Sequence, residues 1–155
     1  IGILMKIDDC DKKILSFLQL DARIAASHIA DELKISIPTV TERIKKLTEG
    51  GVIKGFHASV DPKMVGLDIS AIITIISESS EHYKEVIELA KVTTEVIQCF
   101  STTGKGSHTL IVIAKNSQAL EELLRKIQSW PGVSRTETQV ILSSYDTNKN
   151  SYEIS

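Results

Sequence analysis

The stretch that decides the fold is residues 36–56, "SIPTVTERIKKLTEGGVIKGF". It opens on Ser36, a good helix N-cap, tolerates Pro38 in the first turn, and reaches a helix-ending Gly50-Gly51 pair. At about 100° per residue the apolar positions form one stripe that we expect to face the core, namely Ile37, Val40, Ile44 and Leu47. The sequence therefore predicts an amphipathic helix whose polar face is free to contact another molecule.

Two shorter helices precede this one. Asp8 can cap the first, and the second covers residues 26–34 and leads through a tight connection to Ser36. Their expected core positions are Ile14, Leu15 and Leu18 in the first and Ile29, Ala30 and Leu33 in the second. The run "VIKGFHASV", residues 52–60, reads as a strand. This order indicates a winged helix-turn-helix, whose last helix enters the DNA major groove.

A helix in the major groove needs short polar side chains that reach base edges and long cations that reach phosphates. The candidate DNA-binding residues are Thr39, Thr41 and Glu42 for bases, Arg43, Lys45, Lys46 and Lys54 for phosphates, and Ser36 and Pro38 at the start of the helix. Structural alternatives stay open. Thr39 could only assist the first turn, and Glu42 could pair with Lys45 or Lys46 within the helix. Arg43 could be a structural residue laid over the first helix.

Composition fits an ordinary globular protein: 155 residues, 42% hydrophobic, 25% charged, with a formal net charge of −2. Residues 34–57 depart from that balance, because five Lys/Arg against two Glu give +3. A locally basic patch on an otherwise acidic chain is a modest footprint for nucleic acid, or else a merely solvated helix face.

Several other classes of protein are disfavoured. No apolar run approaches the roughly 20 residues of a membrane span, and no signal peptide opens the chain. Cys10 and Cys99 are too few and too far apart for a disulfide scaffold or a zinc site. The four histidines lack metal-ligand spacing, and no catalytic triad or phosphate loop stands out. We expect no catalytic residue, no metal, no cofactor and no membrane partner. Met5 offers an alternative natural start, with residues 1–4 as an upstream extension; the sequence leaves both open.

The periodicity changes after residue 61, where we place a domain boundary. Strands are expected at 67–77, 95–103, 108–114 and 134–144, and helices at 81–92 and 117–130. The first of these helices should bury Tyr83, Val86, Ile87 and Ala90. The order β-α-β-β-α-β predicts a ferredoxin-like sheet with both helices on one face. The expected fold class is thus α+β, with a helix-turn-helix domain at 1–60, a ferredoxin-like domain at 61–144 and a polar tail at 145–155.

A sheet with helices on one face leaves the other face apolar and in need of a cover. The residues that need it are one of two alternating sets, either Ile69, Ala71, Ile73 and Ile75 or Ile72 and Ile76. The simplest cover is the sheet of a second subunit. We therefore expect a homodimer or a higher even oligomer.

The N-terminal pattern resembles the leucine-responsive regulatory protein/AsnC family. The matching segments are Ile7-Asp8, Asp11 to Leu15, Leu18 to Arg23, Ser36 to Leu47 and Gly51 to Gly55, followed by Thr103-Gly104 and Pro131-Gly132-Val133 in the second half. The resemblance implies a cytoplasmic, sequence-specific transcription regulator that binds double-stranded DNA, dimerises through its C-terminal sheets and forms octamers. It implies no catalysis. The chain departs from the family pattern at two positions, since the usual Ser cap of helix two falls on Ala25 and the usual turn Gly on Lys34.

The resemblance also implies a small-molecule effector, an amino acid or related metabolite, at the contact between dimers. The family's Thr-Gly-x-x-Asp loop falls on residues 103–107, so Ser107 replaces the Asp that would accept from an ammonium. The implied effector-binding residues are Gly104, Lys105, Gly106, Ser107 and His108, with Gln128, Thr136 and Thr138. We expect weak binding of ordinary amino acids and a preference for an anion or a less usual metabolite. Alternatively, Gly104 and Gly106 only let the chain turn.

Two rival functions stay open. A DNA-wrapping architectural protein of the nucleoid type, without an effector, would use the same helix-turn-helix. Some relatives on the same two domains are tetrapyrrole decarboxylases, which use His and Arg at the ligand cleft. The basic recognition helix argues against that enzyme.

Overall fold

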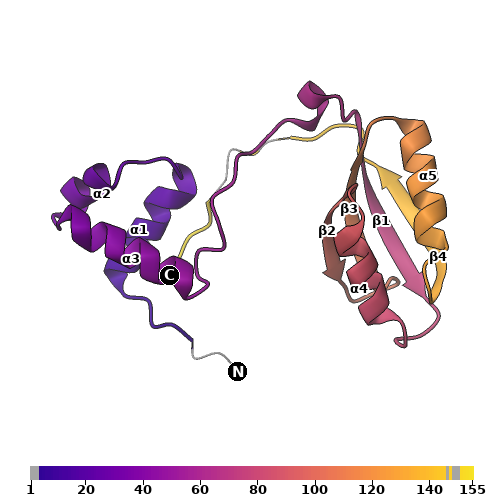
Figure 1. Cartoon of the computed structure of the whole chain (residues 1–155), viewed down its shortest axis with the longest axis horizontal. Helices are drawn as coiled ribbons and strands as arrows, with labels where there is room; N and C mark the ends of the chain where they lie inside the picture. Colours follow the sequence, from indigo (N-terminus) through magenta and orange to yellow (C-terminus); the bar gives the residue numbers. More distant parts are fainter. Residues whose placement is uncertain (1–3, 146, 148–150) are drawn as a thin grey trace. The chain divides into compact units, whose positions relative to one another are not determined.

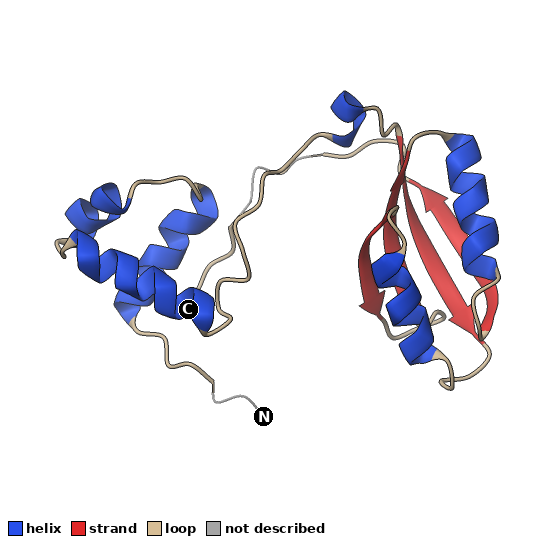
Figure 2. Ribbon diagram, in the orientation of Figure 1, coloured by secondary structure: helices blue, strands red, loops and turns tan. Residues whose placement is uncertain are grey.

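The computed structural model describes residues 4–145, 147 and 151–155. The chain forms two compact units, Ile1–Ser59 with Tyr145–Ser155, and Val60–Ser144 (Figures 1 and 2). The first is helical and the second is built on a sheet, so the α+β class with a helix-turn-helix followed by a ferredoxin-like domain is confirmed.

The helical unit contains α1 (Asp9–Leu20), α2 (Ala26–Leu33) and α3 (Ile37–Glu49). Its core is formed by Ile14, Ile29, Ala30 and Val40. All four lie on the predicted stripes, so the helical periodicity placed the core correctly. Ile37 was expected in the core but is 50% exposed. It is the first residue of α3, where no other helix covers it.

The connection between α2 and α3 is tight because Lys34 takes the left-handed conformation, with φ 55° and ψ 46°. This turn lets the Ile35 amide donate to the Ala30 carbonyl at 3.0 Å. A non-glycine residue is strained there, which explains why glycine suits this turn. At the other end of α2, the N-cap Ala25 makes no side-chain hydrogen bond. Both departures from the family pattern thus weaken α2 at its ends without touching the outward face of α3.

The predicted strand at 52–60 is wrong, since these residues form no strand. Val52 and Ile53 donate to the Leu47 carbonyl at 2.9 and 3.0 Å, which closes the end of α3. The following residues run extended and exposed. A strand needs a partner for its amides and carbonyls, and this segment has none within the described part of the chain. Farther on, a short 3-10 turn, Pro62–Val65, precedes the sheet.

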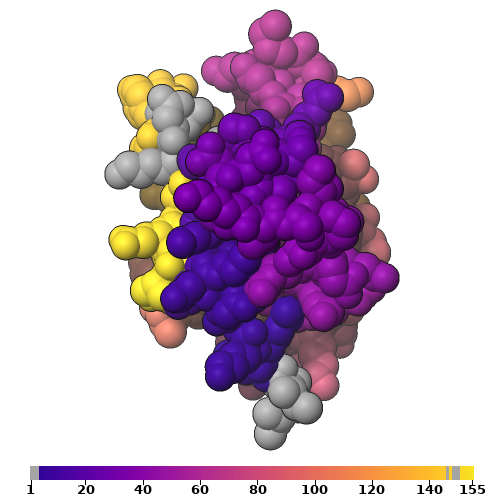
Figure 3. Space-filling model, turned by 90° about the vertical axis from the view of Figure 1, so that its left-hand side faces the viewer, coloured from indigo at the N-terminus to yellow at the C-terminus, as the bar shows by residue number. Residues whose placement is uncertain are grey.

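The tail lies with the helical unit rather than apart from it. The Tyr152 amide donates to Gln19 Oε1 at 2.8 Å. Tyr152 and Ile154 also line a cavity of about 620 Å³ with apolar residues of α1 and of the segment after α3. In Figure 3 the yellow C-terminal residues lie beside the indigo start of the chain. Tyr152 remains largely exposed at this cavity, whereas Ile154 is half-buried.

The second unit has the predicted order of strands and helices. Its elements are β1 (Ile69–Ser77), α4 (Tyr83–Val92), β2 (Val96–Ser101), β3 (His108–Ala114), α5 (Ser117–Gln128) and β4 (Val133–Val140). The strands pair antiparallel in the order β2-β3-β1-β4. Both helices pack on one face, as Figure 2 shows, and bury Ala71, Ile73 and Ile75 of β1. The open face therefore carries the other set, Ile72 and Ile76, joined by Ile111 and Ile113 of β3.

Tyr83 does not lie in the core as expected. It is 37% exposed and stands edge-on to the buried His108, with ring centroids 4.9 Å apart. The position is the first residue of α4, where one side of the ring faces solvent.

Candidate functional site

The outward face of α3 presents most of the candidate DNA-binding residues to solvent. The exposed members are Ser36, Pro38, Thr39, Thr41, Glu42, Lys45 and Lys46. Lys54 is also exposed, but it lines the cavity occupied by the tail rather than the face of α3. The structure thus brings the helix residues together and places Lys54 apart from them.

The hydroxyls at the start of α3 already have local partners. Ser36 Oγ caps the helix by accepting from the Thr39 amide at 3.2 Å, and the two side-chain oxygens lie 2.6 Å apart. Thr41 Oγ1 donates to the Ile37 carbonyl at 3.1 Å. The local role foreseen for Thr39 therefore exists. A hydroxyl that shares one hydrogen bond still has capacity for another, so these contacts leave base reading available.

Arg43 is the exception on this helix, because it points toward α1. Its Nη1 donates to Asp8 at 2.7 and 2.9 Å and to Asp11 Oδ1 at 3.0 Å. The hydrogen bonds from Arg43 hold the pKa of Asp8 below its usual range and raise the pKa of Arg43. Asp8 and Asp11 are also the two halves of the capping box of α1. In this structure Arg43 is thus a cross-link between two helices, the structural alternative that the sequence left open.

The two lysines of α3 are held only weakly. Lys46 Nζ lies 3.8 Å from Glu42 and Lys45 Nζ lies 4.0 Å from Glu49, all at side chains more than half exposed. Exposed pairs at this spacing on a helix contribute little to stability. Both ammonium groups can therefore exchange a glutamate for a phosphate at small cost.

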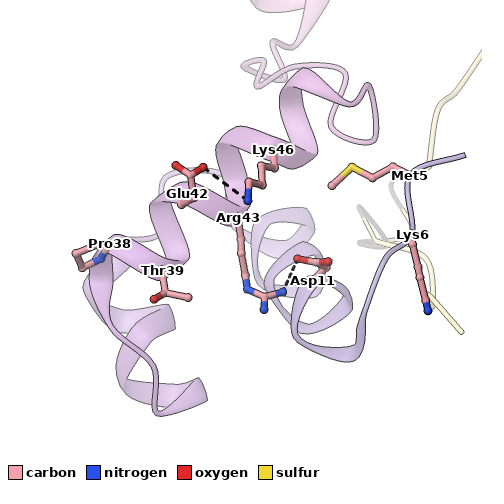
Figure 4. Close-up of a pocket in the computed structure, with 8 residues that line it drawn as sticks. All are labelled: Met5, Lys6, Asp11, Pro38, Thr39, Glu42, Arg43 and Lys46. Carbon is pink, nitrogen blue, oxygen red and sulfur yellow. Dashed lines mark hydrogen bonds and ion pairs between the residues drawn. The ribbon is translucent and has the colours of Figure 1, made fainter. Parts of the chain in front are cut away.

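A groove of about 520 Å³ runs beside α3 (Figure 4). Its residues on α3 are Pro38, Thr39, Glu42, Arg43 and Lys46, and its other residues are Met5, Lys6 and Asp11. Sequence reasoning missed Met5 and Lys6. They precede the first helix and follow no periodic pattern, so no signal in the sequence placed them beside α3.

A second candidate site lies at the loop between β2 and β3. An open pocket of about 450 Å³ is lined by Ser77, Tyr83 and residues 101–107. The loop lies close against the sheet, since a Cβ on Gly106 would come within 2.3 Å of Thr74 Cγ2. Gly106 is therefore needed for close approach, whereas Gly104 is needed for its φ of +96°. Gly104 thus has the turning role foreseen for it, whereas Gly106 allows the loop to lie close to β1.

A chain of hydrogen bonds runs through the floor of this pocket. Ser77 Oγ lies 2.7 Å from Ser107 Oγ, which lies 2.9 Å from His108 Nδ1. His108 is fully buried, and its Nε2 has no partner among the described residues. Burial lowers the pKa of His108, so the ring is neutral at pH 7. No carboxylate lines the described pocket, and Lys105 is its one cation.

The remaining candidate effector residues lie elsewhere in the single chain. Gln128 Nε2 donates to Thr136 Oγ1 at 3.1 Å. Thr136 and Thr138 pair with Ile75 and Ile73 and so share the face covered by helices. None of these three lines the loop pocket, contrary to the expectation of one shared cleft. Lys105 does contact β4, through Glu137 at 3.6 Å.

Among the described residues, no group of three or more His, Cys, Asp or Glu could hold a metal ion. None of the helices within the described ranges is long and apolar enough to cross a membrane.

Comparison with known proteins assigns both units. Residues 7–54 match the family model "Winged helix-turn-helix DNA-binding", and residues 70–150 match "Lrp/AsnC ligand binding domain". The chain is 34% identical to the HTH-type transcriptional regulator FL11 of Pyrococcus horikoshii, over 90% of this chain and 91% of that protein. It is 32% identical to the regulatory protein AsnC of Escherichia coli, over 89% and 91%.

Solved structures agree with this assignment. The structure of E. coli AsnC superposes with a TM-score of 0.82 at 31% identity, covering 90% of this chain and 95% of that one. The leucine response regulatory protein LrpA of Mycobacterium tuberculosis gives 0.85 at 27% identity, covering 96% and 100%. The chain therefore belongs to the Lrp/AsnC family of transcriptional regulators, with a winged helix-turn-helix DNA-binding domain and a C-terminal ligand-binding domain.

Proposed function

We propose that this regulator docks on double-stranded DNA through the outward face of α3, with Lys45 and Lys46 on phosphates and Thr39, Thr41 and Glu42 at base edges. The proposal rests on the difference in contacts between Arg43 and the two lysines of α3. Arg43 is committed to Asp8 and Asp11, whereas Lys45 and Lys46 are exposed and weakly paired. In this proposal the protein acts on the chromosome in the cytoplasm and catalyses no reaction.

Replacing Lys45 or Lys46 by Ala should weaken binding to every DNA sequence. Without one phosphate contact, about one counterion fewer is released when the protein binds. The magnitude of the slope of log affinity against log salt should therefore fall by about one unit. Binding is measured by fluorescence anisotropy from low to moderate salt, on the protein's own promoter and on random DNA. Lys91→Ala is the matched control, because Lys91 is equally exposed but lies on α4. Unchanged affinity and slope in both variants would show that α3 is not the docking element.

The same titrations separate a local regulator from an architectural protein. A sequence-specific regulator should prefer its own promoter over random DNA by about 10³-fold or more at matched salt. Thr39→Ala and Thr41→Ala should reduce this preference more than the overall affinity, because base contacts specify and phosphate contacts position. Equal affinity for both DNAs would instead assign the protein to the architectural class.

We propose further that the open face of the sheet forms the subunit contact. Ile72, Ile76, Ile111 and Ile113 lie on the face that α4 and α5 leave uncovered. An apolar sheet face of this kind is stable when a second sheet packs on it. A homodimer follows, and a further contact between dimers would give the larger even oligomers, including an octamer.

Ile111→Asp should dissociate the oligomer, because it buries a carboxylate at the centre of the proposed contact. Sedimentation velocity at micromolar concentration should give a dimer or larger for the unmodified chain and a smaller species for the variant. Gln118→Asp, which places the same charge on the exposed side of α5, should leave the assembly unchanged. A monomeric unmodified chain would overturn the proposed contact.

For the loop pocket, we propose an anionic or otherwise unusual effector rather than a free amino acid. A zwitterionic amino acid would place its ammonium in a pocket lined by hydroxyls, Tyr83 and Lys105, with no carboxylate to neutralise it. Ser107 can accept a hydrogen bond from the ammonium, but its neutral hydroxyl cannot neutralise that charge as a carboxylate would. Lys105 instead favours a carboxylate or another anion.

Calorimetry with the common amino acids should show weak or absent binding to the unmodified chain. Ser107→Asp should raise the affinity for at least one of them by about tenfold or more, since it restores an acceptor for the ammonium. Ser101→Asp adds the same charge at another position of the pocket and should not raise the affinity for any amino acid. Tight binding of one amino acid through this loop, unaffected by Ser107→Asp, would refute the proposal.

A further inference from the structure

The groove beside α3 has two walls that come from distant parts of the sequence. One wall is α3 itself, with Thr39, Glu42 and Lys46, and the other is the segment before α1, with Met5 and Lys6. Figure 4 shows Met5 pointing toward α3 and Lys6 farther along the same segment, pointing away from the helix. A molecule that contacts the outward face of α3 therefore has Met5 and Lys6 as its next neighbours.

Met5 is held by the end of α3. A Cβ built on Gly50 would lie 2.6 Å from Met5 Sδ, so the thioether fills the space where a side chain would stand. Gly50 has an ordinary φ of −77°, which any residue can adopt. The absence of a side chain at Gly50 thus leaves room for the Met5 side chain at the end of α3.

The charges of the groove leave Lys6 available for a ligand. The groove holds three cations, Lys6, Arg43 and Lys46, and two carboxylates, Asp11 and Glu42. Arg43 neutralises Asp11 and also binds Asp8, while Lys46 pairs weakly with Glu42. Over residues 4–145, 147 and 151–155, no ion pair includes Lys6. Lys6 is therefore a cation without an ion-pair partner among the described residues, beside acidic groups that Arg43 compensates in part.

From this geometry we propose that Lys6 is an additional contact to the DNA backbone, with a phosphodiester lying in the groove between Lys6 and Lys46. This inference rests on the proposed docking of α3. Lys6 and Lys46 line this groove from opposite sides, and the ammonium of lysine is a compact donor suited to a phosphate. The contact is to phosphate alone, so it adds affinity without changing the preferred sequence.

Lys6→Ala in the full chain should lower affinity for promoter and random DNA alike and reduce the salt slope by about one unit. Lys6→Arg should retain most of the affinity and the slope. Lys13→Ala is the matched control, because Lys13 is exposed on α1 but lines a different hollow, with Ser16 and Glu32. Its slope should stay at the value of the unmodified chain.

Suppose that Lys46→Ala weakens DNA binding but Lys6→Ala leaves affinity and salt slope unchanged, as Lys13→Ala does. Lys6 is then not a DNA contact, while the proposed docking of α3 stands. If neither Lys6→Ala nor Lys46→Ala changes binding, the docking of α3 itself is refuted.

Discussion

The guanidinium of Arg43 joins the recognition helix to the first turn of α1, and the arrangement of the helical unit depends on this contact. Arg43 Nη1 lies 2.7 Å from Asp8 and 3.0 Å from Asp11. Those carboxylates cap each other's backbone amides, so one cation stabilises both the start of α1 and its attachment to α3. Because the group is partly exposed, its main effect is orientation rather than a large stabilisation. The buried stripe with Val40 and Leu47 sets which side of α3 faces outward, and Arg43 adds a directed contact to α1.

This contact also determines which charged groups remain unpaired on the surface beside α3. Three carboxylates lie at the start of α1, namely Asp8, Asp9 and Asp11. Left unpaired, they would repel a phosphate backbone beside α3. Arg43 binds two of them and offsets one of their negative charges, while the exposed lysines stay available to a partner. In the second unit, α4 and α5 cover one face of the sheet and leave open the other face, which we propose as the subunit contact.

The helices and the sheet could be predicted from the sequence because their signals are local and periodic. Val40 and Leu47 lie on a stripe at helical spacing, and both are fully buried. The strand at 52–60 failed for the opposite reason: a strand depends on a partner, and the local pattern does not reveal whether one exists. Ile37 and Tyr83 were misplaced because each is the first residue of its helix, where the apolar stripe extends beyond the core.

The candidate sites were only partly predictable. The outward face of α3 follows from its periodicity, but the spacing alone could not show that Arg43 turns back toward α1. Met5 and Lys6 could not be placed beside α3 at all, because the packing of Met5 against Gly50 is a tertiary contact. Likewise, Thr136 and Thr138 were grouped with the loop pocket, whereas the register of β4 directs them to the face covered by helices.

The most direct test of this account is Arg43→Met, which keeps the apolar length of the side chain and removes the charge. Thermal unfolding and DNA binding across a range of salt concentrations are measured on the same protein. We expect Tm to fall by about 4–8 °C, as for the loss of one hydrogen-bonded ion pair in a small domain. The salt slope, measured well below Tm, should stay unchanged, because Arg43 contacts no phosphate. An unchanged Tm with a slope reduced by about one unit would contradict the account and make Arg43 a DNA contact.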